Sequence, residues 1–458
     1  MTSSVRPYLA RSRSEPLIEV TRRMPGRDGQ LPLMCIIYAS FAVALGSDVE
    51  GGSPDGPEYA VSIPASESQP APHIAVPPNR GVDVSVTIDN SHRLCSPATI
   101  LADHPVNTVD GVARWRTAVR DRVLTELDAF LRENRIGAVQ EIAVDDIARR
   151  YVAGGKCLRS TFMYIGWLCG EAPDAAALRA AAALELVHAF AMIQDDVMDE
   201  SELRRGAPTG HVAFADAHRN RRMPGDAGRF GESAAVLLGD ICLVWADKML
   251  RESGIRPDCL YRVWPRFDEM RIELAVGQFG DLLNDVRTEP DFGQVLALAR
   301  AKSGNYTVRR PLELGAAMAG CDESTLSALS RYGRAVGEAF QMRDDLLGVF
   351  GTPDATGKPG DGDLTQHKAT TVVIAARQLA DPAARRELDT LLSAPVVDAG
   401  ATDRLRALIT DSGAPARIEA MISDRVGEAR RTIESTTLPE PMRRVLDGMG
   451  LICVTRHP

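Results

Sequence analysis

Several common protein classes are excluded by what this sequence lacks. Its 53 lysines and arginines are outnumbered by 62 aspartates and glutamates, which gives a formal net charge of −9. A nucleic-acid-binding protein would instead carry a basic stripe, so no nucleic-acid partner is expected. Few stretches alternate apolar and polar residues, and no segment repeats at a fixed period. Neither a sheet-rich fold nor a solenoid is therefore predicted.

The sequence also lacks the spacings of a zinc site or a disulfide framework. The cysteines are scattered and include no CxxC pair, at Cys35, Cys95, Cys157, Cys169, Cys242, Cys259, Cys321 and Cys453. We interpret them as buried or incidental thiols in a reducing compartment. A cytoplasmic location is therefore expected.

Residues 1–105 differ in composition from the rest of the chain. They contain nearly half of the 28 prolines, together with many glycines and serines. Such a segment cannot bury enough apolar surface to offset the entropy lost on ordering. A disordered extension over residues 1–105 is predicted, followed by one helical domain over residues 106–458.

One apolar run interrupts this extension at residues 31–45, behind Arg22, Arg23 and Arg27. At about 15 residues it is short for a membrane-spanning helix, but it has the length of the apolar part of a signal peptide. The polar stretch before it is long for a signal, and a non-native start codon upstream would explain the extension equally well. Both interpretations stay open, and membrane contact is not expected.

From residue 109 onward, apolar residues recur at helical spacing. The first stretch places them three or four positions apart, at Val112, Trp115, Val119, Val123, Leu127 and Leu131. Further helical stretches are predicted at 157–169, 174–199, 232–252, 258–287, 304–319, 323–350, 367–379, 383–393, 402–411 and 415–436. The sequence therefore predicts an all-α protein.

Two acidic segments follow apolar helical runs. In the first, Asp195 and Asp199 are four residues apart, so their carboxylates share one face of a helix, with Asp196 beside them. Like charges at this spacing repel, so a nearby positive group is expected. Asp344 and Asp345 form the second segment. Oxygen clusters of this kind suit Mg2+, held between two helices of a bundle, whereas a solvated acidic face is the alternative.

Basic residues near glycines and near the first acidic segment indicate anion binding. Gly154-Gly155-Lys156 predicts a flexible turn at the start of a helix, with Lys156 and Arg159 on one face. Arg204 and Arg205 follow the acids. A guanidinium group can bind two phosphate oxygens at once, in bidentate fashion. In isolation, each element could also be a plain loop with surface cations.

Together these elements resemble the motifs of trans-isoprenyl diphosphate synthases. The likeness rests on Asp195-Asp196-x-x-Asp199, on Arg204-Arg205-Gly206 and on Phe340-Gln341-x-x-Asp344-Asp345, and runs from about Val109 to Leu451. It implies a single large helical bundle of the isoprenoid synthase type, three Mg2+ ions per site and a homodimer. The implied substrates are isopentenyl diphosphate and allylic diphosphates of C5, C10 or C15.

By resemblance, the matching residues divide into metal ligands and binding residues for two diphosphates. The implied metal ligands are Asp195, Asp199 and Asp344, with Asp196 and Asp345 ordering metal-bound waters. Isopentenyl diphosphate would be bound by Gly155, Lys156, Arg159, His188 and Arg205. The allylic diphosphate would be bound by Arg204, Lys302, Lys358 and Lys368. Ser303 would be a further substrate-binding residue, and Gln278, Asp281 and Gln341 match polar positions near the substrate phosphates. Without the resemblance, His188 would be interpreted as a core histidine.

The implied reaction begins when the allylic diphosphate leaves. Metal ions and cations would neutralise its charge, and the double bond of isopentenyl diphosphate, held alongside, would attack the carbocation. In the family, the departing diphosphate is thought to take the final proton. That role would explain why no general base stands out in the sequence.

Three positions depart from the family pattern. Gly348 stands where the second motif often has a third aspartate, and His367 replaces a common glycine before Lys368. Gly and Asp are interchanged in the loop at 360–363 relative to a common version. Asp344, the position of the family's direct metal ligand, is retained.

The product length is expected to depend on Phe190 and Ala191, which lie about one helical turn before Asp195. A bulky ring at Phe190 with a small Ala191 resembles short-chain synthases that make the C20 product, geranylgeranyl diphosphate. Aromatic residues at both positions would suggest C15, and small residues at both a longer chain. Phe190 could also simply fill the core.

Other functions remain as alternatives. The nearest is a farnesyl diphosphate synthase, followed by a longer-chain synthase. A non-catalytic synthase subunit would be expected to have lost one of the motifs. A terpene cyclase would not need Lys156 or Arg159 to bind a second diphosphate.

Overall fold

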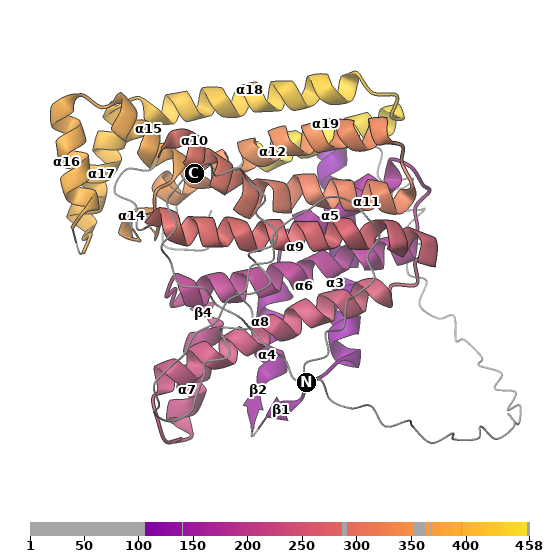
Figure 1. Ribbon diagram of the computed structural model, residues 1–458, viewed down its shortest axis with the longest axis horizontal. Helices are drawn as coiled ribbons and strands as arrows, with labels where there is room; N and C mark the ends of the chain where they lie inside the picture. The colour runs from indigo at the N-terminus through magenta and orange to yellow at the C-terminus, as the bar shows by residue number, and fades with distance from the viewer. Residues whose placement is uncertain are drawn as a thin grey trace, which may run out of the picture. The chain divides into compact units, whose positions relative to one another are not determined.

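The computed structural model describes residues 106–139, 141–285, 291–351, 362–366, 368–394 and 396–455. The extension predicted over residues 1–105 lies outside the described residues, as do Lys358 and His367. The described residues form helices and two short hairpins, so the predicted all-α class is confirmed (Figure 1).

The helices of the N-terminal half are α3 (Val109–Glu133), α4 (Val144–Val152), α5 (Leu158–Leu168), α6 (Ala175–Met198), α7 (Gly210–Asn220), α8 (Ala227–Arg251) and α9 (Pro257–Asp285). They are followed by α10 (Phe292–Ala299), the π-helix η1 (Arg300–Arg309), α11 (Arg310–Ala319), α12 (Glu323–Phe350), α14 (Gly362–Thr365), α15 (Thr371–Leu379), α16 (Pro382–Leu392), α17 (Ala399–Asp411), α18 (Ala414–Glu434) and α19 (Glu440–Val454). The antiparallel hairpins pair β1 (Ala138–Val139) with β2 (Ile142–Ala143), and β3 (Leu203–Arg204) with β4 (Ala207–Pro208).

Most predicted helical stretches are confirmed, with ends that differ by a few residues. The stretch predicted at 304–319 is two elements, because η1 precedes α11. The sequence reading missed α4, α7, α10, α14 and α19. Helix α4 has nine residues and α10 has eight, so each offers only about two turns of periodic signal. The hairpins pair two residues on each strand, too few to show alternation.

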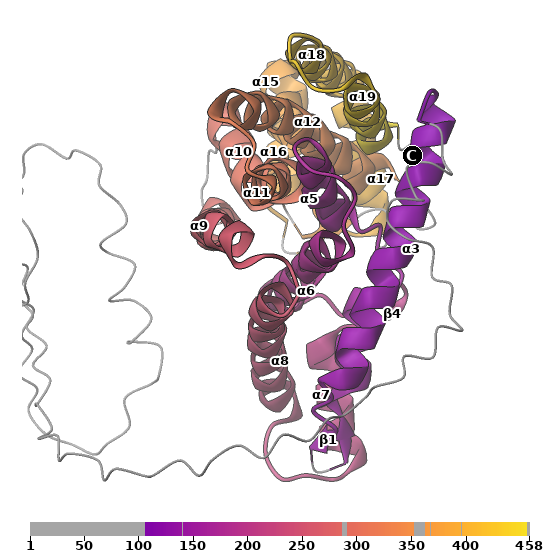
Figure 2. The same ribbon diagram turned by 90° about the vertical axis from the view of Figure 1, so that its right-hand side faces the viewer.

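Helix α6 lies at the centre of this helical unit. It packs against α3, α5 and α8, which surround it in Figure 2. The alanines at 180–183 have no exposed surface, so neighbouring helices approach closely there. Among the described residues, α6 is also the one helix with the length and hydropathy of a membrane span, and 72% of that apolar window is buried inside the fold. Its place in the core accounts for its apolar composition.

Helices α5 and α11 touch backbone to backbone. A Cβ atom on Gly315 of α11 would lie 1.8 Å from the carbonyl oxygen of Met163, and one on Gly166 of α5 would lie 2.3 Å from that of Leu312. Both distances are far below van der Waals contact. Glycine is therefore required at both positions for this packing.

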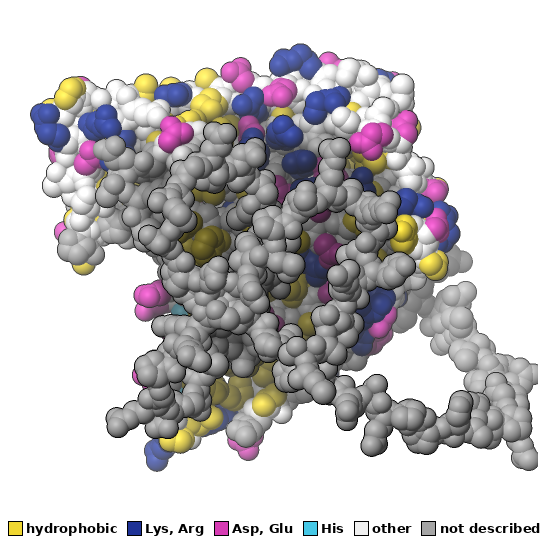
Figure 3. Space-filling view, in the orientation of Figure 1, with side chains coloured by type: hydrophobic (Ala, Val, Ile, Leu, Met, Phe, Trp, Pro, Cys, Tyr) yellow, Lys and Arg dark blue, Asp and Glu magenta, His cyan; other side chains and the backbone are white. Residues whose placement is uncertain are grey.

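Helices α12 and α18 are joined by ion pairs on the upper side of Figure 1. Arg343 lies 2.6 Å from Glu419, and Arg425 lies 2.7 Å from the buried carboxylate of Glu338. In Figure 3, basic and acidic side chains are interspersed along this edge. The second acidic motif lies on α12 and is anchored by this contact.

Candidate active site

The acids of the first motif lie at the C-terminal end of α6, where Asp199 is the C-cap. Asp195 Oδ1 lies 3.1 Å from Nζ of Lys302 and accepts a 3.3 Å hydrogen bond from Gln278. Asp199 Oδ2 accepts a 2.5 Å hydrogen bond from Nζ of Lys368. The spacing of the acids predicted nearby positive groups to offset their repulsion, and Lys302 and Lys368 are these groups.

These ion pairs fix the charge of the groups involved. Burial alone would raise the pKa of Asp195, but Lys302, Lys368 and Arg204 outweigh burial and hold that pKa below its ordinary value. Burial opposes the charge of Lys302, yet Asp195 and Asp281 raise its pKa, and Oδ2 of Asp281 lies 2.6 Å away. The pKa of Lys368 is raised in the same way. The carboxylate and both ammonium groups are therefore charged at neutral pH.

Asp196 has a different environment from its neighbours. Its side chain is fully buried, and it accepts hydrogen bonds of 2.8 Å from Nε of Arg204 and 2.8 Å from the hydroxyl of Tyr151. Nη2 of Arg204 donates a further bond of 2.5 Å. Both carboxylate oxygens of Asp196 therefore accept hydrogen bonds from protein donors, and its expected role in ordering metal-bound water stays a prediction. One residue along a helix rotates the side chain by about 100°, so Asp196 points at the hairpin and holds Arg204.

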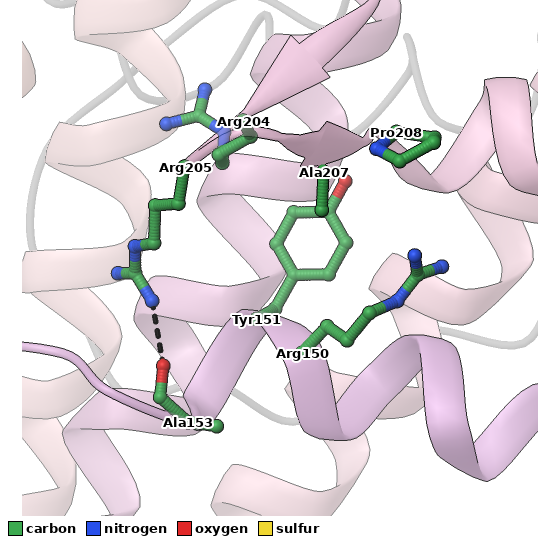
Figure 4. A pocket seen from close by; sticks show the side chains of 7 residues that line it. All are labelled: Arg150, Tyr151, Ala153, Arg204, Arg205, Ala207 and Pro208. Carbon is green, nitrogen blue, oxygen red and sulfur yellow. Dashed lines mark hydrogen bonds between the residues drawn. The ribbon is translucent and has the colours of Figure 1, made fainter. Parts of the chain in front are cut away.

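The turn of the β3–β4 hairpin separates the two arginines of the motif. Arg205 and Gly206 both have positive φ, 52° and 73°, as a two-residue type I′ turn requires. Arg204 lies against Asp195 and Asp196, whereas Nη1 of Arg205 donates a 2.8 Å hydrogen bond to the carbonyl oxygen of Ala153 (Figure 4). Two consecutive residues thus serve different parts of the site.

A pocket of about 380 Å³ is lined by the glycine turn and by Asp344 of the second motif, and we call it the glycine-turn pocket. It gathers predicted binding residues from five separate elements of the chain. Its lining consists of Gly154, Gly155, Lys156, Cys157, Leu158, Arg159, Glu185, His188, Arg205, Ser303, Thr307, Phe340 and Asp344. The sequence motifs for one of the two diphosphates therefore converge in space.

The glycine turn differs in one detail from the expectation. Helix α5 begins at Leu158, so Lys156 precedes it and does not share a helical face with Arg159. The N-cap is Cys157, which adopts the left-handed conformation with φ 47°. The strained cap turns the backbone, and both cations line the same pocket as a result.

His188 faces cations and an aromatic ring. Arg159 stacks over the ring of Tyr306 with its Cζ 4.3 Å from the centroid, and the His188 ring lies 6.4 Å from the same centroid. Burial lowers the pKa of His188 well below its ordinary value, and Arg159, Arg204 and Arg205 lower it further. The imidazole is therefore neutral at pH 7, and its buried Nδ1 has no hydrogen-bond partner within the described residues.

The second motif is divided in the same way as the first. Asp344 lines the glycine-turn pocket, whereas Asp345 is buried. Oδ2 of Asp345 accepts 2.9 Å and 2.6 Å hydrogen bonds from the backbone and hydroxyl of Thr371, and Oδ1 accepts 2.8 Å from Gln341. Burial raises the pKa of Asp345. Asp345 therefore joins α12 to α15, and Gln341 holds the same carboxylate from within α12. Their expected roles near metal-bound water and the substrate phosphates stay predictions.

Some residues of the site were missed by the sequence reading. Glu185 lies one helical turn before His188 in the glycine-turn pocket, and its Oε1 accepts 2.8 Å from the hydroxyl of Ser160. Arg120 of α3 donates a 2.7 Å hydrogen bond from Nε to the carbonyl oxygen of Gly155. Thr307 follows the predicted Ser303 by four residues. Glu185 and Thr307 each lie one helical turn from a predicted site residue, His188 and Ser303, and this spacing could have indicated them. Nothing in the sequence indicates Arg120.

Phe190 and Ala191 are each half-buried and pack against the hydrophobic core. Both lie on α6, in the turns that precede the acids. This placement puts the side chains close to the acidic end of the helix. It is compatible with a role in product length and with simple core filling.

The donors available to Mg2+ at this site are carboxylate oxygens. No three acidic, histidine or cysteine side chains form a preformed metal cluster within the described part of the chain. Asp195 and Asp199 nevertheless supply carboxylate oxygens from one helix end. Mg2+ usually takes one or two protein carboxylates and fills its remaining positions with water and substrate phosphate. The two acids therefore fit such an ion.

Residues 142–409 match the family model described as polyprenyl synthetase. The chain belongs to the polyprenyl synthetase family. A geranylfarnesyl diphosphate synthase from Aeropyrum pernix is 34% identical over 268 residues, which cover 55% of this chain and 78% of that relative. A geranylgeranyl diphosphate synthase from Mycobacterium tuberculosis is 35% identical over 260 residues, covering 56% of this chain and 68% of that relative.

Solved structures of this polyprenyl synthetase family share the fold. The crystal structure of a geranylgeranyl pyrophosphate synthase from Corynebacterium glutamicum, complexed with isoprenyl diphosphate and magnesium, has a TM-score of 0.70 and 33% sequence identity. The match covers 75% of this chain and 98% of that chain. The family match begins at residue 142, so α3 and its Arg120 precede the matched segment.

Proposed function

We propose that this polyprenyl synthetase is a Mg2+-dependent geranylgeranyl diphosphate synthase. Family membership makes the chain a prenyl diphosphate synthase. The observation that carries the proposal concerns two pairs of consecutive residues, Arg204-Arg205 and Lys302-Ser303. In each pair, one residue lies at the acids and the other lines the glycine-turn pocket. Arg204 and Lys302 contact Asp195, whereas Arg205 and Ser303 line the glycine-turn pocket. A reaction that joins two diphosphate substrates needs two such sites side by side.

The residues at the acids would bind the allylic diphosphate of C5, C10 or C15. Mg2+, held by Asp195 and Asp199 and by Asp344 on α12, would neutralise the leaving diphosphate when bound. Lys302, Lys368 and Arg204 would add positive charge to the same oxygens. The bond between the allylic carbon and its oxygen then breaks, and the electron pair leaves with the diphosphate.

The residues of the glycine-turn pocket would hold isopentenyl diphosphate. Lys156, Arg159 and Arg205 supply positive charge, and neutral His188 supplies a hydrogen bond. The double bond attacks the allylic carbon, a new carbon–carbon bond forms, and the departing diphosphate takes the proton that is lost. Glu185 offsets part of the positive charge and ties the pocket to α5 through Ser160.

The C20 product is proposed from the pair Phe190 and Ala191 on α6. One bulky and one small residue below the acids would admit a C15 primer for one further condensation. The relatives named above make products of different length, so the C15 product of a farnesyl diphosphate synthase is the main alternative. Longer products follow if the tunnel floor lies beyond Phe190.

A product assay tests this proposal. The purified protein is incubated with Mg2+, labelled isopentenyl diphosphate and each of the C5, C10 and C15 allylic diphosphates, and chain length is read by chromatography. A C20 product is expected, and Phe190→Ala should lengthen it because the ring is removed. A C15 product, or an unchanged product in the variant, would contradict the chain-length assignment. No condensation with any primer would contradict the synthase activity and favour a non-catalytic subunit or a cyclase.

A cytoplasmic homodimer is proposed as well. Helix α9 exposes an apolar stripe at helical spacing, formed by Ile272, Val276, Phe279 and Leu283, each with 42–54% of its surface accessible. Contiguous exposed apolar surface of this kind is typical of a protein interface. All described cysteines are free thiols, which is compatible with a reducing compartment.

A further inference from the structure

A second pocket lies between the end of α4 and the β3–β4 hairpin, and we call it the hairpin pocket (Figure 4). It has a volume of about 260 Å³. Its lining consists of Arg150, Tyr151, Ala153, Arg204, Arg205, Ala207 and Pro208. Arg150 belongs to none of the motifs discussed above, and the proposed reaction gives it no role.

The charges around the hairpin pocket are unbalanced. Arg150 and Arg205 are exposed, and Arg150 has no hydrogen-bond or ion-pair partner within the described residues. Arg204 is the exception, since its guanidinium is bound by Asp196. No acidic side chain lines the pocket. Guanidinium groups that share a pocket repel one another, and a bound anion would relieve the repulsion.

The remaining walls of the hairpin pocket are apolar. The hydroxyl of Tyr151 is already engaged, because it donates to Asp196 and accepts a 2.8 Å hydrogen bond from the backbone N–H of Gly210. Burial and the charge of Asp196 raise the pKa of Tyr151, so the phenol stays neutral. In Figure 4 its ring lies between Arg205 and Arg150, and Ala207 and Pro208 of the hairpin add further apolar surface to the lining.

We propose that the hairpin pocket binds a diphosphate group outside the two substrate sites. Planar guanidinium forks match phosphate oxygens, and two arginines from different elements can bind one such group from two directions. Pockets that enclose a whole organic ligand usually measure about 300–1,000 Å³. The hairpin pocket is smaller, so it would take a headgroup only, either free inorganic diphosphate or the head of a prenyl ester.

Arg205 connects the hairpin pocket with the glycine-turn pocket, because it lines both. A diphosphate in the hairpin pocket would draw this guanidinium away from isopentenyl diphosphate. The ligand would therefore weaken substrate binding, and by linkage the substrate would weaken ligand binding to the same extent. This coupling rests on the proposed function, whereas binding in the hairpin pocket does not.

Calorimetric titration of the full chain with inorganic diphosphate, in EDTA to remove metal, tests the binding. Wild-type protein should show two binding events. Lys156→Ala should weaken the event in the glycine-turn pocket, and Arg150→Ala should weaken the other by about tenfold, as expected for a charge-assisted bond. Arg385→Ala removes an exposed arginine on α16 and serves as the matched control, with both events unchanged. The proposal is overturned if Arg150→Ala changes nothing, or if both variants weaken one single event.

Two further arms identify the source of the headgroup and its effect. The titration is repeated with an unreactive thiodiphosphate ester of C15. If inorganic diphosphate gives a binding event that depends on Arg150, the natural ligand is the free anion. If only the ester gives such an event, the ligand is the headgroup of a prenyl diphosphate. In steady-state assays, added inorganic diphosphate should raise the KM for isopentenyl diphosphate more in wild type than in Arg150→Ala. Equal inhibition would overturn the coupling through Arg205, and a protein without condensation activity would still give the binding result.

Discussion

At the scale of single residues, each acidic motif has one carboxylate that is buried within the fold and a neighbouring one that is partly exposed. Asp196 and Asp345 are buried and accept hydrogen bonds from Arg204, Tyr151 and Thr371. Removing either would leave buried donors without a partner, which costs stability as well as activity. Activity loss at these two positions would therefore not identify a metal ligand.

Asp195 offers a cleaner test of metal binding. It is partly exposed, and Lys302 and Arg204 keep other acidic partners in Asp281 and Asp196 if it is replaced. Asp195→Ala should therefore fold, yet lower kcat by roughly 10²–10³-fold or more, because the leaving diphosphate loses its metal. Steady-state kinetics measures kcat, and a thermal melt verifies folding.

The control for this variant is Asp216→Ala, which removes an exposed acid on α7 that pairs with Arg219. It should leave kcat unchanged. If kcat of Asp195→Ala fell by less than about tenfold, Asp195 would contribute less than about 1.4 kcal/mol to transition-state stabilisation. Such a contribution is too small for a metal ligand.

The sequence was sufficient to predict which residues lie at the site, but not the direction in which each side chain points. The motif spacing placed Asp195 and Asp199 at one helix end, and the lysines found there were expected. The rotation of α6 and α12 against their neighbours decides which acid faces inward, and that rotation depends on packing partners far away in the chain. Arg120 lies 35 residues before its partner Gly155 in the sequence and belongs to no pattern.

At the scale of secondary-structure elements, close backbone contact sets where the site residues lie. Gly304 of η1 meets Gly337 of α12, where a Cβ atom would lie 2.8 Å from the backbone carbon of Gly337. The widened turns of η1 carry Lys302 toward Asp195 and Ser303 toward the glycine-turn pocket. π-Helical turns are often found at functional sites for this reason.

The contact between α5 and α11 predicts a stability effect. Gly315→Ala would bring a methyl group to 1.8 Å from the carbonyl oxygen of Met163, so the helices must separate. Overpacking of this kind costs about 1–3 kcal/mol, and the midpoint of thermal unfolding should fall by several degrees. Differential scanning fluorimetry measures the midpoint.

Gly400→Ala on α17 is the matched control. A Cβ atom there would lie 3.5 Å from Oδ1 of Asp398, which is ordinary contact. Alanine favours helix over glycine by about 1 kcal/mol, so this variant should be as stable as wild type or more stable. An unchanged midpoint for Gly315→Ala would mean that α5 and α11 are packed less closely than described.

At the scale of the whole molecule, the stripe on α9 predicts how two copies associate. Ile272→Glu places a charge in the middle of the stripe, where 52% of the isoleucine surface is exposed. The single chain should fold normally, whereas a dimer would have to bury an unpaired carboxylate. Light scattering after gel filtration should therefore give about 49.5 kDa for the variant and about twice this mass for wild type.

Val396→Glu provides the control for this experiment. Val396 is 78% exposed and lies in the segment between α16 and α17, outside α9. This variant should remain dimeric. A dimeric Ile272→Glu protein would place the interface elsewhere, and a monomeric wild type would contradict the proposed homodimer.

The hydrogen bond from Arg120 to Gly155 also bears on where the functional unit begins. The recognisable family segment starts at residue 142 and includes every motif residue. A truncation at that point would remove α3, which packs against α6 and α19 and holds the glycine turn from behind. The shortest catalytically complete protein therefore starts upstream of its recognisable signature, and a boundary chosen from the motifs alone would be drawn too late.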